Sequence, residues 1–280
     1  MNAFTGKQAA SSKEKSGNSA EENLRGVKHK IIVMSGKGGV GKSTVAVNLA
    51  AGLAKKGRKV GLLDADMHGP SVPKMLGLPN LPLNIDENGK IVPAMFGSSI
   101  KVVSIAFLLK DTDSPVIWRG PVKMGAIKQF LEEVSWGELD YLIVDLPPGT
   151  GDEPLSVAQL VPSPDGTIIV TTPQDVALLS VRKSINFAKA VGLRTLGLVE
   201  NMYGLQCTHC GKEIKLFEDG GVERAVRDMS IPILGKLPID PEIARSGDDG
   251  KPFAGGSNGI SKAFEPITDR IIELVEEEVN

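Results

Sequence analysis

The chain has 280 residues, of which 32 are lysine or arginine and 34 are aspartate or glutamate, so its formal net charge is -2. This near-neutral charge excludes a bulk electrostatic attraction to nucleic acid or to an anionic membrane as the main mode of binding. Because the chain has only two cysteines, 4% aromatic residues and 32 glycines, a disulfide scaffold is excluded and a turn-rich α/β protein is favoured.

The first 29 residues are predicted to form a disordered N-terminal tail, because lysine, glutamate, serine and asparagine are scattered through them without an apolar segment. They do not have the pattern of an export signal, and the chain has no uninterrupted apolar stretch of about 18 residues. We therefore expect a cytoplasmic protein that binds neither nucleic acid nor a membrane.

From residue 30 onward, short β-branched runs alternate with helical patterns, which is typical of βαβ units around a parallel sheet. The strands are expected at 31–35, 60–66, 102–107, 141–145, 167–172, 196–201 and 232–238. The helices are expected at 42–56, 121–134, 176–191 (capped by Asp175) and 266–279. The pattern predicts one domain at 30–280, a doubly wound and mostly parallel sheet with helices on both faces.

A phosphate-binding loop directly follows the first predicted strand. Its nine residues match G-x-x-x-x-G-K-[ST], with strand before and helix after, which is the P-loop NTPase arrangement. They are Gly36, Lys37, Gly38, Gly39, Val40, Gly41, Lys42, Ser43 and Thr44. The glycines let backbone N–H groups point at phosphate oxygens. Lys42 is expected to reach the β and γ phosphates of ATP, Ser43 to hold Mg²⁺, and Thr44 to donate to the α phosphate.

Acidic residues end two other predicted strands. Asp145 follows the apolar run at 141–144. In phosphate-binding sites of this kind, a carboxylate at such a position acts on Mg²⁺ directly or through water. The second strand ends in Asp64-Ala65-Asp66. Caps of helices are the alternative role for these residues, since strand-end carboxylates often serve only in that way.

Cys207 and Cys210 have the spacing of a metal-binding knuckle, in a loop near residues 203–217. One pair supplies half of a tetrahedral or cluster site, and a second copy of the chain would complete four thiolates across a two-fold axis. A zinc bridge, a redox-active disulfide and an accidental pair of thiols are the alternatives. His209, between the two cysteines, is expected to be exposed rather than coordinating.

Several motifs occur in the order found in the Mrp family of iron-sulfur cluster carrier ATPases, within the deviant-Walker group of P-loop ATPases. They are KGGVGKST, DADMHGPS from Asp64, WRGP from Trp118, DLPPGTGD from Asp145, the C-x-x-C pair and PIDPEIARSGDDGKPF. The chain resembles this family over roughly residues 30 to 254. This resemblance implies an ATP-dependent carrier that takes a cluster from an assembly scaffold and transfers it to apo iron-sulfur proteins.

The resemblance also implies roles for particular residues. Lys37 would cross a homodimer interface to the partner's ATP, so that hydrolysis is slow until the dimer closes. Asp66 would position the attacking water, and Asn201 and Pro238 would contact adenine. Cys207 and Cys210 of both copies would hold one [4Fe-4S] cluster. The catalytic residues are therefore expected to be Lys37, Lys42 and Asp66.

Other functions remain open at this point. A positioning ATPase that cycles on a membrane or nucleoid, like the septum-positioning and partition proteins, shares the loop, but the chain ends in Glu276, Glu277 and Glu278 rather than a basic amphipathic helix. A zinc-bridged dimeric regulatory ATPase would use the same four thiolates. An electron donor like the nitrogenase iron protein draws its cluster ligands from cysteines far apart in sequence, and a small-molecule kinase leaves Lys37 unexplained.

Overall fold

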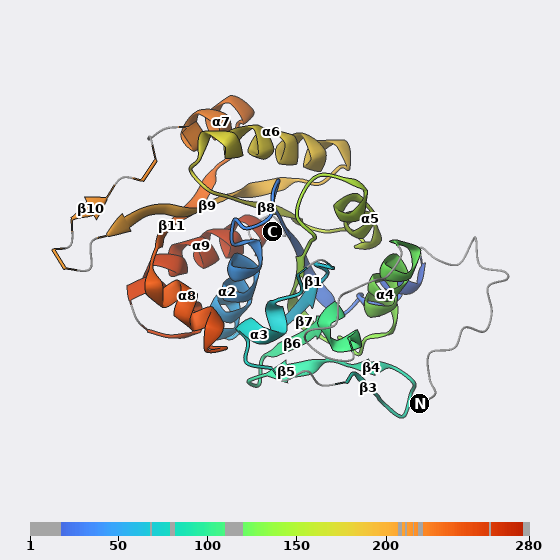
Figure 1. The fold of residues 1–280 in the computed structure, drawn as a ribbon. Coiled ribbons are helices and arrows are strands. Elements are labelled where there is room, and N and C mark those ends of the chain that lie inside the picture. The colour runs from blue at the N-terminus through green and yellow to red at the C-terminus, as the bar shows by residue number, and fades with distance from the viewer. Residues whose placement is uncertain are drawn as a thin grey trace.

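The computed structural model describes residues 18–67, 69–78, 82–109, 120–206, 209–210, 212–214, 216–217, 221–257 and 259–276 of the chain. Their main feature is one sheet with the strand order β10-β9-β8-β1-β7-β2-β6-β5, in which β11 also pairs with β9 (Figure 1). The inner strands run parallel, while β5 and β10 pair antiparallel at the two edges.

The strands of the sheet are β1 (Val27–Met34), β2 (Val60–Asp64), β5 (Ala94–Phe96), β6 (Ile100–Ser104), β7 (Leu139–Asp145), β8 (Gly166–Thr171), β9 (Thr195–Gln206), β10 (Glu213–Ile214) and β11 (Ile233–Ile239). A separate two-stranded ribbon pairs β3 (Asn84–Ile85) with β4 (Ile91–Val92). The helices are α1 (Asn18–Asn23), α2 (Lys42–Lys55), α3 (Val72–Met75), α4 (Gly120–Glu133), α5 (Asp152–Leu160), α6 (Asp175–Ala190), α7 (Gly221–Met229), α8 (Pro241–Asp248) and α9 (Gly259–Glu276), with 3-10 turns at Ile105–Leu108 and Phe253–Gly255.

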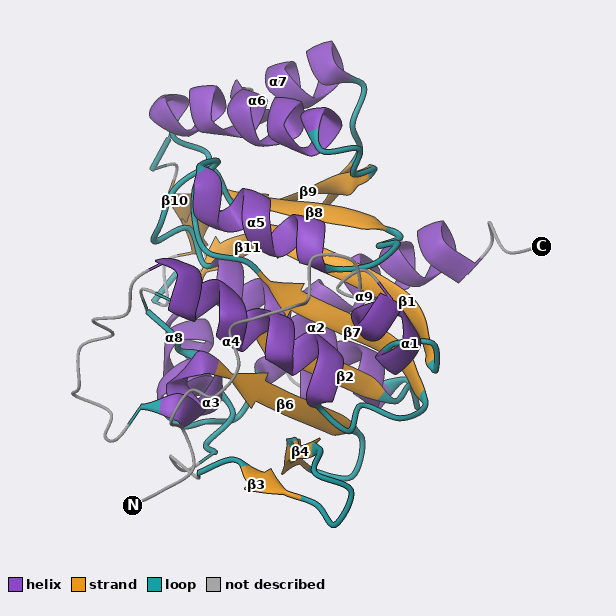
Figure 2. Ribbon diagram, turned by 90° about the vertical axis from the view of Figure 1, so that its right-hand side faces the viewer, coloured by secondary structure: helices purple, strands orange, loops and turns teal. Residues whose placement is uncertain are grey.

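Helices cover both faces of the sheet, and each face has its own apolar core (Figure 2). Side chains of β1 alternate between the two cores, with Ile32 and Met34 on one face and Ile31 and Val33 on the other. The first core is closed by α1, α4, α5, α6 and α7, and the second by α2, α3 and α9. The predicted doubly wound α/β fold is confirmed.

The seven predicted strands are all present as β1, β2, β6, β7, β8, β9 and β11. The prediction of a tail up to residue 29 is wrong from residue 18, because α1 and the first residues of β1 belong to the fold. Ala20 and Leu24 are buried, and the Asn23 amide donates to the carbonyl oxygens of Leu131 and Val134 at 2.9 Å each. Residues 1–17 lie outside the described ranges, and the single domain stays a prediction.

The last helix begins seven residues before the position expected for it. Proline usually interrupts a helix interior, and this suggested a start at Pro266. Instead α9 runs through Pro266 from Gly259, because Ile260 and Phe264 are already buried, with Phe264 edge-on to Phe253 at a ring separation of 5.6 Å.

Within the described ranges, none of the helices combines the length and apolar composition that a membrane span requires.

Candidate functional site

The parallel register brings the ends of four strands to one edge of the sheet. Val33 of β1 lies beside Asp145 of β7, Asp145 beside Asp64 of β2, and Asp64 beside Ser104 of β6. The phosphate loop leaves β1 at this same edge and leads into α2. The strand-end residues identified in the sequence therefore meet beside the loop, as expected for ligand sites of such sheets.

The loop is held in a conformation that requires glycine. Gly39 and Gly41 have φ of +77° and +83°, in the left-handed region that favours glycine. The amide Nδ2 of buried Asn201 donates to the carbonyl oxygen of Val40 at 2.9 Å. A Cβ at Gly41 would overlap the same amide nitrogen, and a Cβ at Gly36 would overlap the backbone of Ser180 in α6. The loop is thus packed between β9 and α6.

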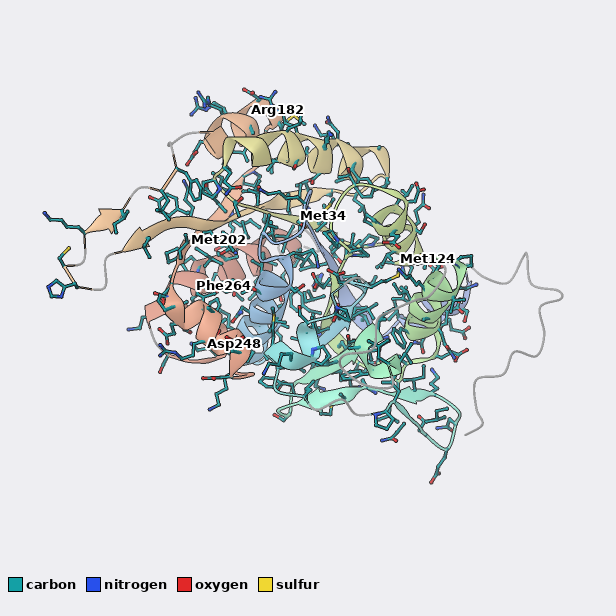
Figure 3. All side chains as sticks on the ribbon, in the orientation of Figure 1. Met34, Met124, Arg182, Met202, Asp248 and Phe264 are labelled. Carbon is teal, nitrogen blue, oxygen red and sulfur yellow. The ribbon has the colours of Figure 1, made fainter. Side chains whose placement is uncertain are left out.

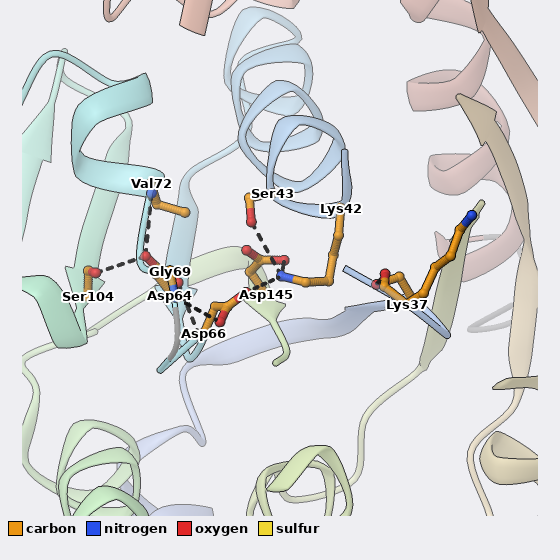
Figure 4. A network of polar contacts seen from close by, with 10 residues as sticks. Lys37, Lys42, Ser43, Asp64, Asp66, Gly69, Val72, Ser104 and Asp145 are labelled. Atoms are coloured by element: carbon orange, nitrogen blue, oxygen red, sulfur yellow. Dashed lines mark hydrogen bonds and ion pairs between the residues drawn. The ribbon is translucent and has the colours of Figure 1, made fainter. Parts of the chain in front are cut away.

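Lys42 connects the loop to the strand-end carboxylates (Figure 4). Its Nζ lies 2.7 Å from Oδ1 of Asp145 and 3.4 Å from Oδ2 of Asp66, and it donates to the Ser43 hydroxyl oxygen at 3.3 Å. Burial alone would lower the pKa of Lys42, but the charges of Asp145 and Asp66 outweigh burial and raise it. Lys42 therefore remains an ammonium ion, which can bind phosphate oxygens in place of these carboxylates.

Asp145 fits the role expected for it toward Mg²⁺. Its side chain is fully buried, and its Oδ2 has no hydrogen-bond partner among the described residues. Burial raises the pKa of Asp145, while Lys42 and the Ser43 hydroxyl act in the opposite direction. A hard cation with its water shell would satisfy the open oxygen, and Ser43 lies close enough to share it.

Asp64 and Asp66 have different surroundings. The carboxylate of Asp64 is fully buried and accepts from the Ser104 hydroxyl at 2.8 Å and from the Asp66 N–H at 3.1 Å. Burial and the neighbouring Asp145 raise the pKa of Asp64 to about 7. Asp66 instead lies at the surface of the loop cavity. The arrangement supports Asp66 over Asp64 as the group that faces a substrate. The contribution of Ser104 was missed, because serine at a strand end has no specific sequence signal.

Lys37 points away from Lys42 and Asp145 (Figure 4). Its Nζ donates to Oε1 of Gln174 at 3.0 Å, in the segment between β8 and α6. Sequence reasoning missed Gln174, because a glutamine before a helix is too common to suggest a role. Lys37 is thus placed outside the group of residues that would surround its own chain's γ phosphate.

Two cavities lie near these residues. One of about 410 Å³ is lined by the loop together with Asp66, Gly69, Ser71, Met75 and Pro148. A larger one of about 1200 Å³ lies among β9, β11, α8 and α9 and is lined by Pro238 and Asp240, among others. Asn201 lies within β9, beside the loop, rather than in a turn. Pro238 is within β11 and does not end it. Adenine contact by both residues stays a prediction.

Cys210 of the predicted metal pair is separated from this group by an extension of the sheet. β9 runs on past Asn201 to Gln206, and β10 returns antiparallel to it, away from the rest of the molecule (Figure 1). Cys210 is exposed and unbridged, and His209 is exposed as expected. Cys207 lies outside the described residues, as does Trp118 of the WRGP motif. Ile214 and Leu216, which follow Cys210 in the sequence, are exposed apolar side chains.

Comparison with known proteins finds a family model and relatives that match most of the chain. The family model of the NUBPL iron-transfer P-loop NTPases, of the ParA type, matches residues 26–272. An iron-sulfur cluster carrier protein of Methanocaldococcus jannaschii is 49% identical over 255 residues, which cover 91% of this chain and 88% of the relative. A carrier protein of Saccharolobus solfataricus is 52% identical over 255 residues, covering 90% and 86%.

Solved structures of related proteins have the same fold as this chain. A nucleotide-binding protein of Archaeoglobus fulgidus in complex with ADP superposes with a TM-score of 0.75 and 41% identity, covering 84% of this chain and 92% of that chain. The cell division ATPase MinD of Pyrococcus furiosus gives a TM-score of 0.64 and 26% identity, covering 88% and 99%. The resemblance identified from the sequence motifs is confirmed at the level of the family.

Lys42→Ala is predicted to weaken ADP binding by at least about 100-fold, because the phosphates lose their buried cation and the Asp145 and Asp66 carboxylates are left to repel them. Calorimetric titration with Mg-ADP measures this loss. Lys37→Ala is the matched control from the same loop and is expected to retain the affinity. An affinity of Lys42→Ala close to that of the unchanged chain would contradict the assignment.

Proposed function

This chain belongs to the NUBPL iron-transfer P-loop NTPase family, and on that premise we propose that it is an iron-sulfur cluster carrier whose cargo is held by Cys207 and Cys210. The observation that carries the proposal is the exposed Cys210, placed at the end of a strand extension that starts beside the phosphate loop. The carrier names of relatives 49% and 52% identical support it. The relation to a positioning ATPase is more distant, at 26% identity.

The cargo is proposed to be one [4Fe-4S] cluster bound between two copies of the chain. A four-iron cluster takes four thiolates, and the sequence provides two per chain. A homodimer supplies the remainder and leaves the cluster near the surface, where an assembly scaffold can load it and an apoprotein can take it. The exposed apolar side chains of Ile214 and Leu216, which follow Cys210 in the sequence, are suited to such contacts.

ATP is the proposed nucleotide, and its hydrolysis is proposed to be slow. Lys42 would move from Asp145 and Asp66 to the β and γ phosphates, and Asp66 would then orient water for attack on the γ phosphorus, with ADP as the leaving group. Ser43 and Asp145 would hold Mg²⁺, which neutralises phosphate charge. Lys37 would be supplied by the second copy, and its position away from Lys42 supports this.

The cytoplasm is the proposed location. A bovine relative, 47% identical over 235 residues that cover 82% of this chain, is named a cytosolic Fe-S cluster assembly factor. A reducing compartment also suits two cysteines that act as metal ligands.

Anaerobic reconstitution with iron and sulfide is expected to give a brown dimer with about four iron atoms per two chains. Cys210→Ser and Cys207→Ser should each abolish the colour, because either change removes two of the four thiolates from the dimer. His209→Ala is the matched control from the same loop and should retain the cluster. A colourless protein that holds zinc instead would support the zinc-bridged regulatory ATPase and overturn the carrier proposal.

Lys37→Ala is expected to lower the ATPase turnover by at least about 100-fold while ADP affinity is retained, because the cation that stabilises the transition state then comes from neither copy. Turnover is measured at several protein concentrations, since a contribution from a second copy depends on dimer formation. Lys74→Ala, an exposed lysine on α3 beside the same cavity, should leave turnover unchanged. Equal turnover of Lys37→Ala and the unchanged chain would remove the role of Lys37.

A further inference from the structure

β9 takes part in two separate regions of the molecule. At Asn201 it contacts the phosphate loop, and five residues later, at Gln206, it ends next to the cysteine-bearing segment. β1, β2, β6, β7 and β8 reach only the loop edge of the sheet, whereas β9 runs on into the extension, with β11 paired to it as far as Leu205 (Figure 1). β9 therefore leads from the nucleotide site toward the segment that contains Cys210.

The contact at Asn201 is close and buried. Its side chain is 4% exposed, its amide donates to the Val40 carbonyl oxygen at 2.9 Å, and the absence of a Cβ at Gly41 makes the approach possible. A change in the orientation of the Val40 peptide would break this hydrogen bond unless Asn201 moved with it. Leaving a buried amide without its partner is costly, so the two groups are expected to move together.

The strand changes its backbone geometry directly after this contact. Met202 has φ of +59°, in the left-handed region that a residue with a side chain seldom adopts (Figure 3 labels Met202). The pairing with β11 shifts here: Asn201 pairs with Leu237, and the next pair is Leu205 with Ile239. Four steps along β9 thus face two steps along β11, so β9 bulges between Asn201 and Leu205.

Lys236 of β11 contacts residues on both sides of Met202. Its Nζ lies 2.9 Å from Oε2 of buried Glu200, which precedes Asn201, and 4.7 Å from the ring centre of Tyr203, which follows Met202. It also pairs with Glu223 of α7. Glu200 and Tyr203 are therefore held to the same lysine of a neighbouring strand, so a displacement at Asn201 is passed through the backbone at Met202 to Tyr203.

We propose that Asn201 is a positioning residue that couples occupancy of the phosphate loop to the conformation of the Cys210 end of β9. Phosphate binding orders the N–H groups of the loop and with them the Val40 peptide, Asn201 follows through its hydrogen bond, and the bulge at Met202 transmits the change along β9. This regulation rests on the proposed function, because it gives the nucleotide control over the cargo site. The coupling is reciprocal, so a cargo on the thiolates alters nucleotide affinity by the same factor.

The test uses the reactivity of Cys210 in full-length protein carrying Cys207→Ser, in which Cys210 is the one remaining thiol. The rate of alkylation by N-ethylmaleimide reports the exposure and ionisation of this thiol. It is measured with and without Mg²⁺ and inorganic tripolyphosphate, which fills the loop but carries no base and so leaves adenine contact by Asn201 out of the comparison. We expect tripolyphosphate to change the rate by about fivefold.

Asn201→Ala is expected to remove this change while tripolyphosphate, measured by calorimetry, still binds. Asn186→Ala, an exposed asparagine on α6, is the matched control and should keep the full change. Equal rates with and without tripolyphosphate in the protein with Asn201 intact would overturn the proposal. A change that survives in Asn201→Ala would overturn it as well.

Met202→Gly decides the question if Asn201→Ala does not fold or does not bind tripolyphosphate. Glycine adopts positive φ without a steric cost, so the fold and the contact to Val40 are kept while the bulge becomes flexible. The rate change is then expected to fall below about twofold, and an undiminished change would contradict the proposal. None of these measurements involves iron, so a failure of cluster assembly would overturn the carrier function and leave this result intact.

Discussion

The ammonium group of Lys42, buried between the carboxylates of Asp145 and Asp66, is the interaction on which the nucleotide site depends. Removing three charged groups from water is costly, and it is tolerated here because the opposite charges satisfy one another at distances of 2.7 and 3.4 Å. A nucleotide brings its own negative charge and can replace the carboxylates around Lys42. In the proposed mechanism, the same exchange would make Asp145 available to Mg²⁺ and Asp66 available to the attacking water.

The parallel sheet determines which parts of the chain can respond to this exchange. Strands β1, β2, β6 and β7 end together at the loop edge and hold the charged groups in one row. β9 continues beyond that edge, and its Asn201 is hydrogen-bonded to the loop while its far end lies next to the cysteine segment. The phosphate loop and the β9 extension are therefore parts of one hydrogen-bonded structure, although they lie at different places on the molecule.

The sequence predicted the parts of this structure that depend on local patterns. Short apolar runs that alternate with helical patterns were sufficient to predict the seven main strands. The spacing of glycine and lysine was sufficient to predict the phosphate-binding loop. It did not predict contacts between distant segments, such as Asn201 with Val40, Lys37 with Gln174 or Asp64 with Ser104. The short helix α1 was missed because one buried residue within it, Ala20, and another directly after it, Leu24, are too few for a clear periodicity. The start of α9 was predicted at Pro266 instead of Gly259. The helix continues through Pro266 because the packing of Phe264 outweighs the backbone hydrogen bond that the proline cannot donate.

The most direct test of the account measures the linkage between nucleotide and cargo in the intact protein. ADP affinity is determined by calorimetry, under anaerobic conditions, for the apo protein and for the protein loaded with its iron-sulfur cluster. If the phosphate loop and the cysteine pair are joined through β9, the two dissociation constants differ by at least about fivefold, the lower end of typical coupling between two binding sites. Equal dissociation constants would contradict the account, because a carrier whose nucleotide site does not sense the cargo has no such connection.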